Sequence, residues 1–218
     1  MSELYFFDRT QDYTVLARKL PHWVQPGVVS FITLRTDDSI PKPVLARWRE
    51  DRAEWLRQRA INPIASGWRQ RLAELESSEQ EDFYRRFSAK WHSELDAGYG
   101  ACMLQQPELA AIVSESLRHA DGEKYCLTDF IVMPNHVHIL CAFIDEMGLL
   151  SVCESWKRFT ARQINKATGQ TGRFWQQDGF DHLIRSEEQF RHFQKYIQEN
   201  AQKAGLMPGQ SLHYSAGI

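Results

Sequence analysis

The sequence lacks the marks of exported, membrane-spanning and disulfide-stabilised proteins. No run of about 18 consecutive apolar residues occurs among its 218 residues, so it contains no candidate membrane span. The amino-terminal stretch MSELYFFDRTQDY has neither the basic start nor the apolar segment of a signal peptide. The four cysteines form no C-x-x-C pair, which argues against both a zinc ribbon and a disulfide framework. We therefore expect a cytoplasmic protein with reduced thiols and no membrane partner.

The chain also lacks an overall positive charge. Its formal net charge is −2, which by itself argues against a nucleic-acid partner. The segment from Trp156 to Lys203 differs from this average, because it holds nine basic residues and only five acidic ones. A net-positive carboxy-terminal segment therefore leaves nucleic acid open as a partner.

Hydrophobic residues make up 43% of the chain and charged residues 25%, which is typical of a globular protein. We expect one domain over residues 1–218. Strands are predicted at 28–35, in the two runs YCLTDFIVM and HVHILCAF, and within GRFWQQDGFDHLI. Helices are predicted at 107–122, at 149–169 and at about 187–204, where Ser186 is the expected cap of the last one.

The stretch from about 43 to 96 differs from the rest, because it is rich in Arg, Glu, Leu and Ala with tryptophans at helical intervals. We interpret it as a helical insertion. Without it, the order of elements is βαββαβ followed by one helix. The predicted fold class is therefore α+β, a ferredoxin-like fold with an antiparallel sheet and a carboxy-terminal helix that carries a tyrosine.

Two histidines stand one residue apart in the run FIVMPNHVHIL. Because strand side chains alternate, His136 and His138 are expected on one face, about 6.5 Å apart, with Val137 and Ile139 on the other. Two such imidazoles can bind one metal ion. The alternative is a pair of core histidines satisfied by backbone or carboxylate partners.

The last predicted helix carries a second group of polar residues. Its packing stripe is apolar, and Tyr196 and Asn200 lie four residues apart on the flank of that stripe. Lys203 and His192 extend the flank. From periodicity alone, packing in the core or at its rim is the more common role of a tyrosine at such a helix position.

The motif VMPNHVHIL, together with LPHWVQPG, SWKRFTARQIN and DHLIRSEEQFRHFQKYIQENAQKAGL, resembles the REP-associated tyrosine transposases, relatives of the single-tyrosine HUH transposases. This resemblance implies an HUH nuclease domain in which His136 and His138 hold a divalent cation, Tyr196 is the nucleophile and Asn200 is a third metal ligand. The family pattern usually has proline after the asparagine, whereas Ala201 follows Asn200 here.

The resemblance also implies the reaction and the partner. The expected activity is a metal-dependent endonuclease and strand transferase that acts on single-stranded DNA beside REP-type palindromic hairpins. Cleavage leaves a 5′-phosphotyrosine and a free 3′-hydroxyl. The expected cofactor is Mg²⁺ or Mn²⁺, the expected location is the nucleoid, and the protein is expected to act as a monomer or homodimer.

Basic residues near the predicted site are candidates for DNA binding. Lys157 and Arg158 lie early in the helix after the histidine strand, Arg185 precedes the tyrosine helix and Lys203 lies near its end. Each can instead be part of a solvated helix face. As a group they can bind phosphates and hold a DNA strand in register.

Two other functions are consistent with the same residues. One is a DNA-binding or regulatory protein that keeps the fold and cleaves weakly. The other is a metal hydrolase that uses water and forms no covalent link to tyrosine. Metal-stimulated nicking of hairpin DNA distinguishes the first from a transposase, and protein-linked DNA distinguishes the second.

Overall fold

A computed structural model describes residues 4–8, 10–16, 22–89, 94–95, 97–145, 148–177 and 180–217. The chain folds into two compact units. One comprises residues 1–37 and 102–218, and the other comprises residues 38–101. None of the described helices combines the length and the apolar composition that a membrane span requires.

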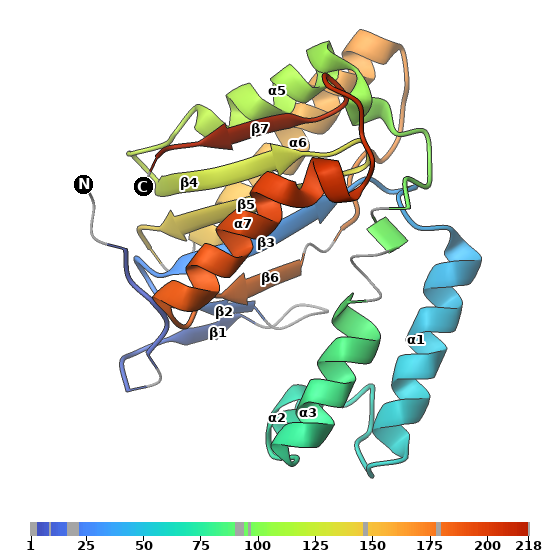
Figure 1. Cartoon of the computed structure of the whole chain (residues 1–218), viewed down its shortest axis with the longest axis vertical. Helices are drawn as coiled ribbons and strands as arrows, with labels where there is room; N and C mark the ends of the chain where they lie inside the picture. The colour runs from blue at the N-terminus through green and yellow to red at the C-terminus, as the bar shows by residue number, and fades with distance from the viewer. Residues whose placement is uncertain are drawn as a thin grey trace. The chain divides into compact units, whose positions relative to one another are not determined.

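The larger unit is built on a five-stranded antiparallel sheet (Figure 1). Its strands are β3 (Val29–Arg35), β4 (Tyr125–Val132), β5 (His136–Phe143), β6 (Phe180–Leu183) and β7 (Leu212–Ser215), in the spatial order β6-β3-β5-β4-β7. The first four strands in this order have the arrangement of a ferredoxin-like βαββαβ fold, with α5 (Pro107–Arg118) and α6 (Gly148–Thr168) as the crossover helices. The predicted α+β fold class is therefore confirmed.

Helices cover both faces of this sheet. Side chains of α5 and α6 pack on one face, in a core with Ile32, Leu127, Val137 and Ile139. Helix α7 (Glu187–Lys203) packs on the other face, where it shares a core with Phe31, Leu140 and other residues. Figure 1 shows α7 in front of the sheet and α5 and α6 behind it. Because side chains alternate along β5, Val137 and Ile139 point towards α6, and His138, the residue between them, points towards α7.

The sequence of α7 explains both of its ends and its position. Ser186 caps the helix, because its hydroxyl accepts a hydrogen bond from the Gln189 amide at 3.1 Å. Gly205 follows the helix with φ +67°, a backbone conformation that favours glycine. Phe190 and Ile197 are buried on the sheet, and the Gln194 amide donates to the Asp129 carboxylate at 3.0 Å. These contacts fix the face that α7 turns to the sheet.

Residues 38–101 form a helical unit of their own. It contains α1 (Lys42–Arg57), α2 (Trp68–Ala73), α3 (Ser77–Phe83) and a π-helix at Tyr84–Ala89. Their shared core is aromatic, with Trp55 packed edge-on against Phe83 at a centroid distance of 5.1 Å. The expected insertion at about 43–96 lies inside this unit, and its treatment as part of a single transposase domain stays a prediction.

The sequence does not predict three of the strands. β1 (Thr14–Leu16) and β2 (His22–Val24) form a small antiparallel pair of their own, and β7 lies at the edge of the main sheet beside β4. Each has only three or four residues, which is too short for an alternating pattern to be recognised.

Candidate active site

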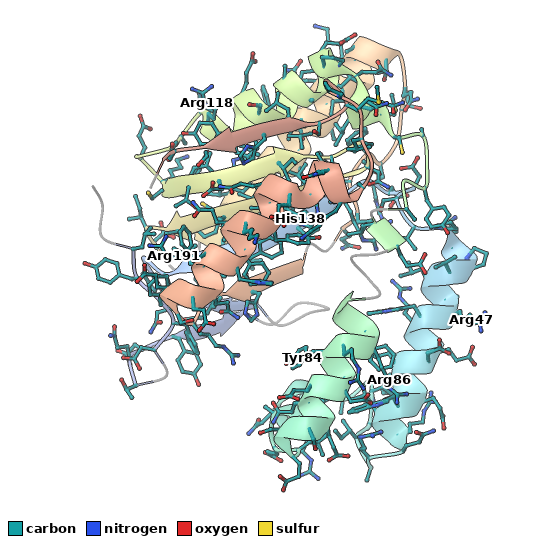
Figure 2. The ribbon with its side chains drawn as sticks, in the orientation of Figure 1. Arg47, Tyr84, Arg86, Arg118, His138 and Arg191 are labelled. Atoms are coloured by element: carbon teal, nitrogen blue, oxygen red, sulfur yellow. The ribbon has the colours of Figure 1, made fainter. Side chains whose placement is uncertain are left out.

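The site is centred on the contact between β5 and α7. His138 is fully buried on β5, and its Nε2 atom lies 3.3 Å from the Tyr196 hydroxyl oxygen. The two rings meet nearly edge-on at a centroid distance of 5.1 Å. Figure 2 shows His138 behind the middle of α7. Two residues that are 58 positions apart in the sequence therefore meet in one hydrogen bond.

His136 and His138 lie on the same face of the sheet, and their ring centroids are 4.6 Å apart. Each imidazole has one nitrogen engaged by a neighbouring side chain. The Nδ1 atom of His138 lies 2.9 Å from the Thr33 hydroxyl, and the Nδ1 atom of His136 lies 2.8 Å from the Asn135 amide oxygen. A cation bound by both residues would therefore be coordinated through Nε2 in each case.

Asn200 is fully buried, one turn after Tyr196 on α7. The sequence predicts this position on the flank of the apolar stripe, whereas the structure buries it completely, because α7 turns it towards the sheet. Helix α7 runs against the direction of β5 (Figure 1), so residues after Tyr196 approach residues before His138. Four helical residues rise about 6 Å and two strand residues about 6.5 Å. We infer that Asn200 lies at the level of His136.

The amide of Asn200 has an unusual environment. Within the described part of the chain, neither its oxygen nor its nitrogen has a hydrogen-bond partner, although both atoms are buried. A buried amide without a partner destabilises a fold by about 1–3 kcal/mol. A metal ligand or a substrate contact would satisfy this amide.

The residues present fit a divalent cation. Two neutral imidazoles and one amide oxygen leave the ion its full charge and leave coordination positions for phosphate oxygens and water. No three His, Cys, Asp or Glu side chains gather into a metal-binding group among the described residues. The donor set of His136, His138 and Asn200 is of a different kind, because its third member is an amide.

If the Asn200 amide binds a metal ion or the substrate, its removal should increase the stability of the protein and weaken ligand binding. Asn200→Leu is expected to raise the unfolding free energy of the metal-free protein by about 1 kcal/mol or more, because it removes an unsatisfied buried amide. Urea denaturation without metal measures this change. The same variant should bind Mn²⁺ more weakly than the unchanged protein.

Asn165→Leu is the matched control for this variant. The Asn165 amide donates to the Gly172 carbonyl oxygen at 3.0 Å, so its removal should lower stability. A loss of stability in both Asn200→Leu and the smaller Asn200→Ala would show that the Asn200 amide has a structural role instead.

Two residues of β3 belong to this face and were missed by sequence reasoning. In the antiparallel register of β3 and β5, Thr33 pairs with His138 and Arg35 pairs with His136. Directly paired residues project to the same face, so Arg35, a mostly buried residue, lies on the face that α7 covers. The sequence predicts the strand, but it carries no signal for its register with β5.

The four basic residues proposed for DNA binding do not gather in one place. Lys203 lies beside Tyr196, with its Nζ atom 5.9 Å from the ring centroid. Arg185 lies two residues before Glu187, the first residue of α7, which is itself about 14 Å from Tyr196 along the axis of that helix. Lys157 and Arg158 belong to α6, which packs on the opposite face of the sheet, and Lys157 Nζ donates to the Gln177 carbonyl oxygen at 2.6 Å.

The contacts and burial of Tyr125, Tyr214 and Cys141 indicate structural roles for these residues. The Tyr125 hydroxyl donates to the Leu117 carbonyl oxygen at 2.8 Å, and burial raises the pKa of Tyr125. Tyr214 stacks on Phe130 at a centroid distance of 5.0 Å. Burial raises the pKa of the Cys141 thiol well above its usual range, so this thiol is not a nucleophile.

Comparison with known proteins shows a resemblance to one transposase family over part of the chain. Residues 104–200 match the family described as transposase IS200 like. No curated protein matches the chain. A solved structure, described as the REP-associated tyrosine transposase bound to a REP hairpin, aligns with 14% identity and a TM-score of 0.42, over 88% of this chain and 76% of that chain. The first of these findings confirms the resemblance to transposases over residues 104–200, a range that contains both histidines, Tyr196 and Asn200.

Proposed function

We propose that this protein is a single-tyrosine HUH transposase that nicks single-stranded DNA beside a hairpin and joins the 5′ phosphate to Tyr196. The observation that carries the proposal is the 3.3 Å contact between the Tyr196 hydroxyl and His138 Nε2. This contact holds a phenol, which can act as a nucleophile, against the histidine pair. The match to the IS200-like transposase family over the same residues supports a DNA-processing enzyme.

In the proposed reaction, the Tyr196 hydroxyl oxygen attacks the scissile phosphorus. The new O–P bond forms as the bond from phosphorus to the 3′ oxygen of the preceding nucleotide breaks. The phenol loses its proton, and the departing 3′ oxygen gains one. The products are a 5′-phosphotyrosine and a 3′-hydroxyl, and attack by another 3′-hydroxyl on the phosphotyrosine reverses the step on a new strand.

A tyrosine is a weak nucleophile at neutral pH. With a pKa near 10, about one phenol in a thousand is ionised at pH 7, and forming the phenolate costs roughly 4 kcal/mol. Mg²⁺ or Mn²⁺ held by His136, His138 and Asn200 would act as a Lewis acid that polarises the scissile phosphate. The chain's own contribution is to fix the phenol against this group of side chains, with Phe31 packed beside both the Tyr196 and His138 rings.

The proposed DNA contacts follow from the positions of the cations. Lys203 lies beside the Tyr196 ring, and Arg35 is in register with His136. Both can contact a phosphate near the scissile bond. The assignments of Lys157, Arg158 and Arg185 to DNA stay predictions, and on their positions they would contact parts of the DNA that lie further from Tyr196.

DNA affinity should depend on salt if phosphates dominate binding. We expect log Kd for hairpin-bearing single-stranded DNA to rise with log salt concentration, by about 0.7 for each phosphate contact. Fluorescence anisotropy at several KCl concentrations measures this slope. Lys203→Gln should reduce the slope by about one contact.

Lys195→Gln provides a matched control on the same helix. Both lysines form an i,i+4 ion pair with Glu199, at 3.1 Å for Lys203 and 3.7 Å for Lys195. Only Lys203 lies over the Tyr196 ring among the described cation–ring contacts. Equal slopes for the two variants would contradict the assignment of Lys203 to DNA, and a flat salt response in the unchanged protein would contradict a nucleic-acid partner.

A further inference from the structure

The hydroxyl of Thr33 contacts one of the two histidines of the site. It lies 2.9 Å from Nδ1 of His138, and it comes from β3, the strand beside the histidine strand. Thr33 is buried, with 2% of its surface exposed, and so is the imidazole that it contacts. A hydrogen bond between two buried groups fixes both of them, because neither has water as an alternative partner.

This bond determines which nitrogen of His138 faces the tyrosine. With Nδ1 directed at Thr33, Nε2 is directed at the Tyr196 hydroxyl. The ring is also held between side chains, since it stacks on Phe31 with an interplanar angle of 20° and a centroid distance of 5.2 Å. Stacking restricts the plane of the ring, but it does not distinguish one orientation from its 180° flip. The hydrogen bond to Thr33 does.

We infer that Thr33 is a positioning residue for the metal site, which holds the His138 ring so that Nε2 lies on the Tyr196 side of the ring, where it would be available to a cation. This inference rests on the proposed function, because it concerns the same site. A nitrogen that coordinates a cation carries no proton, so a neutral His138 coordinating through Nε2 carries its proton on Nδ1. The Thr33 hydroxyl oxygen is then the acceptor of that proton.

A threonine suits this position better than a carbonyl group or an apolar side chain. Its hydroxyl can donate or accept, so it satisfies Nδ1 in either protonation arrangement of the ring. When Tyr196 is bonded to Nε2, the proton of His138 can reside on either nitrogen. With a cation at Nε2, the Thr33 hydroxyl would be the acceptor for the proton on Nδ1. One nitrogen cannot hold both the cation and the tyrosine hydroxyl, so with a cation at Nε2 the phenol would be held beside the site by the packing of its ring against Phe31.

Metal affinity tests the inference with a readout other than cleavage. Thr33→Val keeps the shape of the side chain and removes the hydroxyl. Its Kd for Mn²⁺, measured by calorimetry on the full chain without DNA, should rise about 10–100-fold, which is the usual effect of removing a partner behind a metal-bound histidine. Thr33→Ser keeps the hydroxyl and should bind Mn²⁺ nearly as well as the unchanged protein.

The imidazole nitrogens provide a second readout in the metal-free protein. Side-chain ¹⁵N NMR distinguishes protonated from unprotonated ring nitrogens, and the His138 signals should change in Thr33→Val and stay near those of the unchanged protein in Thr33→Ser. Circular dichroism confirms that both variants are folded.

The possible outcomes separate the role of Thr33 from the proposed function. If the unchanged protein binds no Mn²⁺, or if His138→Ala binds Mn²⁺ as well as the unchanged protein does, the assignment of the metal site is wrong. If the unchanged protein binds Mn²⁺ at that site and Thr33→Val binds it equally well, the metal site stands and the role of Thr33 is overturned. Loss of affinity in Thr33→Val with recovery in Thr33→Ser supports the inference.

Discussion

Tyr196→Phe is expected to abolish nicking of hairpin-bearing single-stranded DNA. The substitution removes only the hydroxyl oxygen, which is the proposed nucleophile, and keeps the ring that packs against Phe31 and His138. Losing a nucleophile commonly lowers a rate by a factor of about 10³ or more. We therefore expect no measurable nick in Mg²⁺ or Mn²⁺, in a protein that is folded and binds the hairpin with unchanged affinity. Gel electrophoresis of labelled DNA and anisotropy on the same samples measure both.

Two other tyrosines serve as controls for this result. Tyr214→Phe should cleave normally, because Tyr214 stacks on Phe130 on the face of the sheet opposite to α7. Tyr125→Phe should lose some stability and retain its cleavage rate per folded molecule, since its hydroxyl bonds to the Leu117 carbonyl. If Tyr196→Phe still nicks DNA at the normal rate while one of these variants does not, the active site has been assigned to the wrong helix.

His136→Ala and His138→Ala should each reduce cleavage to a similar extent, with hairpin binding largely preserved. The reason is that the histidines serve the chemical step, whereas DNA affinity comes mainly from cations such as Lys203. The double variant should be no worse than either single variant if the two imidazoles form one metal site. Single-turnover cleavage rates at saturating protein measure the chemical step apart from binding.

His182→Ala is the control for a general effect on folding. His182 lies on β6, opposite Phe31 in the register of β3 and β6, and its ring contacts Phe193 of α7 at a centroid distance of 5.9 Å. It therefore belongs to the same face of the sheet, outside the proposed donor set. Normal cleavage in His182→Ala, together with loss of cleavage in His136→Ala and His138→Ala, supports the metal site. Full cleavage by either His136→Ala or His138→Ala in Mg²⁺ would contradict it.

The sequence is informative where local patterns determine structure. Alternation in HVHILCAF places both histidines on one face, and the order of strands and helices identifies the ferredoxin-like arrangement. Ser186 marks the start of α7, as the sequence predicts. These features depend on neighbours within a few residues, so the sequence alone predicts them.

The environment of Asn200 shows where local patterns fail. Its helical position predicts the flank of the apolar stripe, but the structure buries it completely. The width of the buried face depends on how α7 is rotated against the sheet. That rotation is fixed by contacts with distant residues, such as the hydrogen bond from Gln194 to Asp129. Amphipathic periodicity carries no information on these contacts.

The roles of Thr33 and Arg35 required the pairing of distant strands. Thr33 is separated from His138 by 105 positions. Register between strands is set by the hydrophobic pattern on both strands and by tertiary packing. The sequence of a single protein predicts strand β3, but it does not predict which residue of β3 faces which histidine.

The distribution of basic residues has a similar explanation. Lys157 and Lys203 both follow the histidine strand in the sequence, yet they lie on helices that cover opposite faces of the sheet. Net charge over a segment therefore predicts a partner of opposite charge without predicting a continuous binding surface.

The covalent intermediate is the most direct test of the proposed mechanism. The protein is incubated with hairpin-bearing single-stranded DNA and Mn²⁺, denatured, and digested with protease and nuclease, and the peptides are mapped by mass spectrometry. We expect a nucleotide joined through its 5′ phosphate to the peptide that contains Tyr196, and no such adduct in Tyr196→Phe. Cleaved DNA with no protein-linked nucleotide, or an adduct on a different residue, would contradict attack by Tyr196.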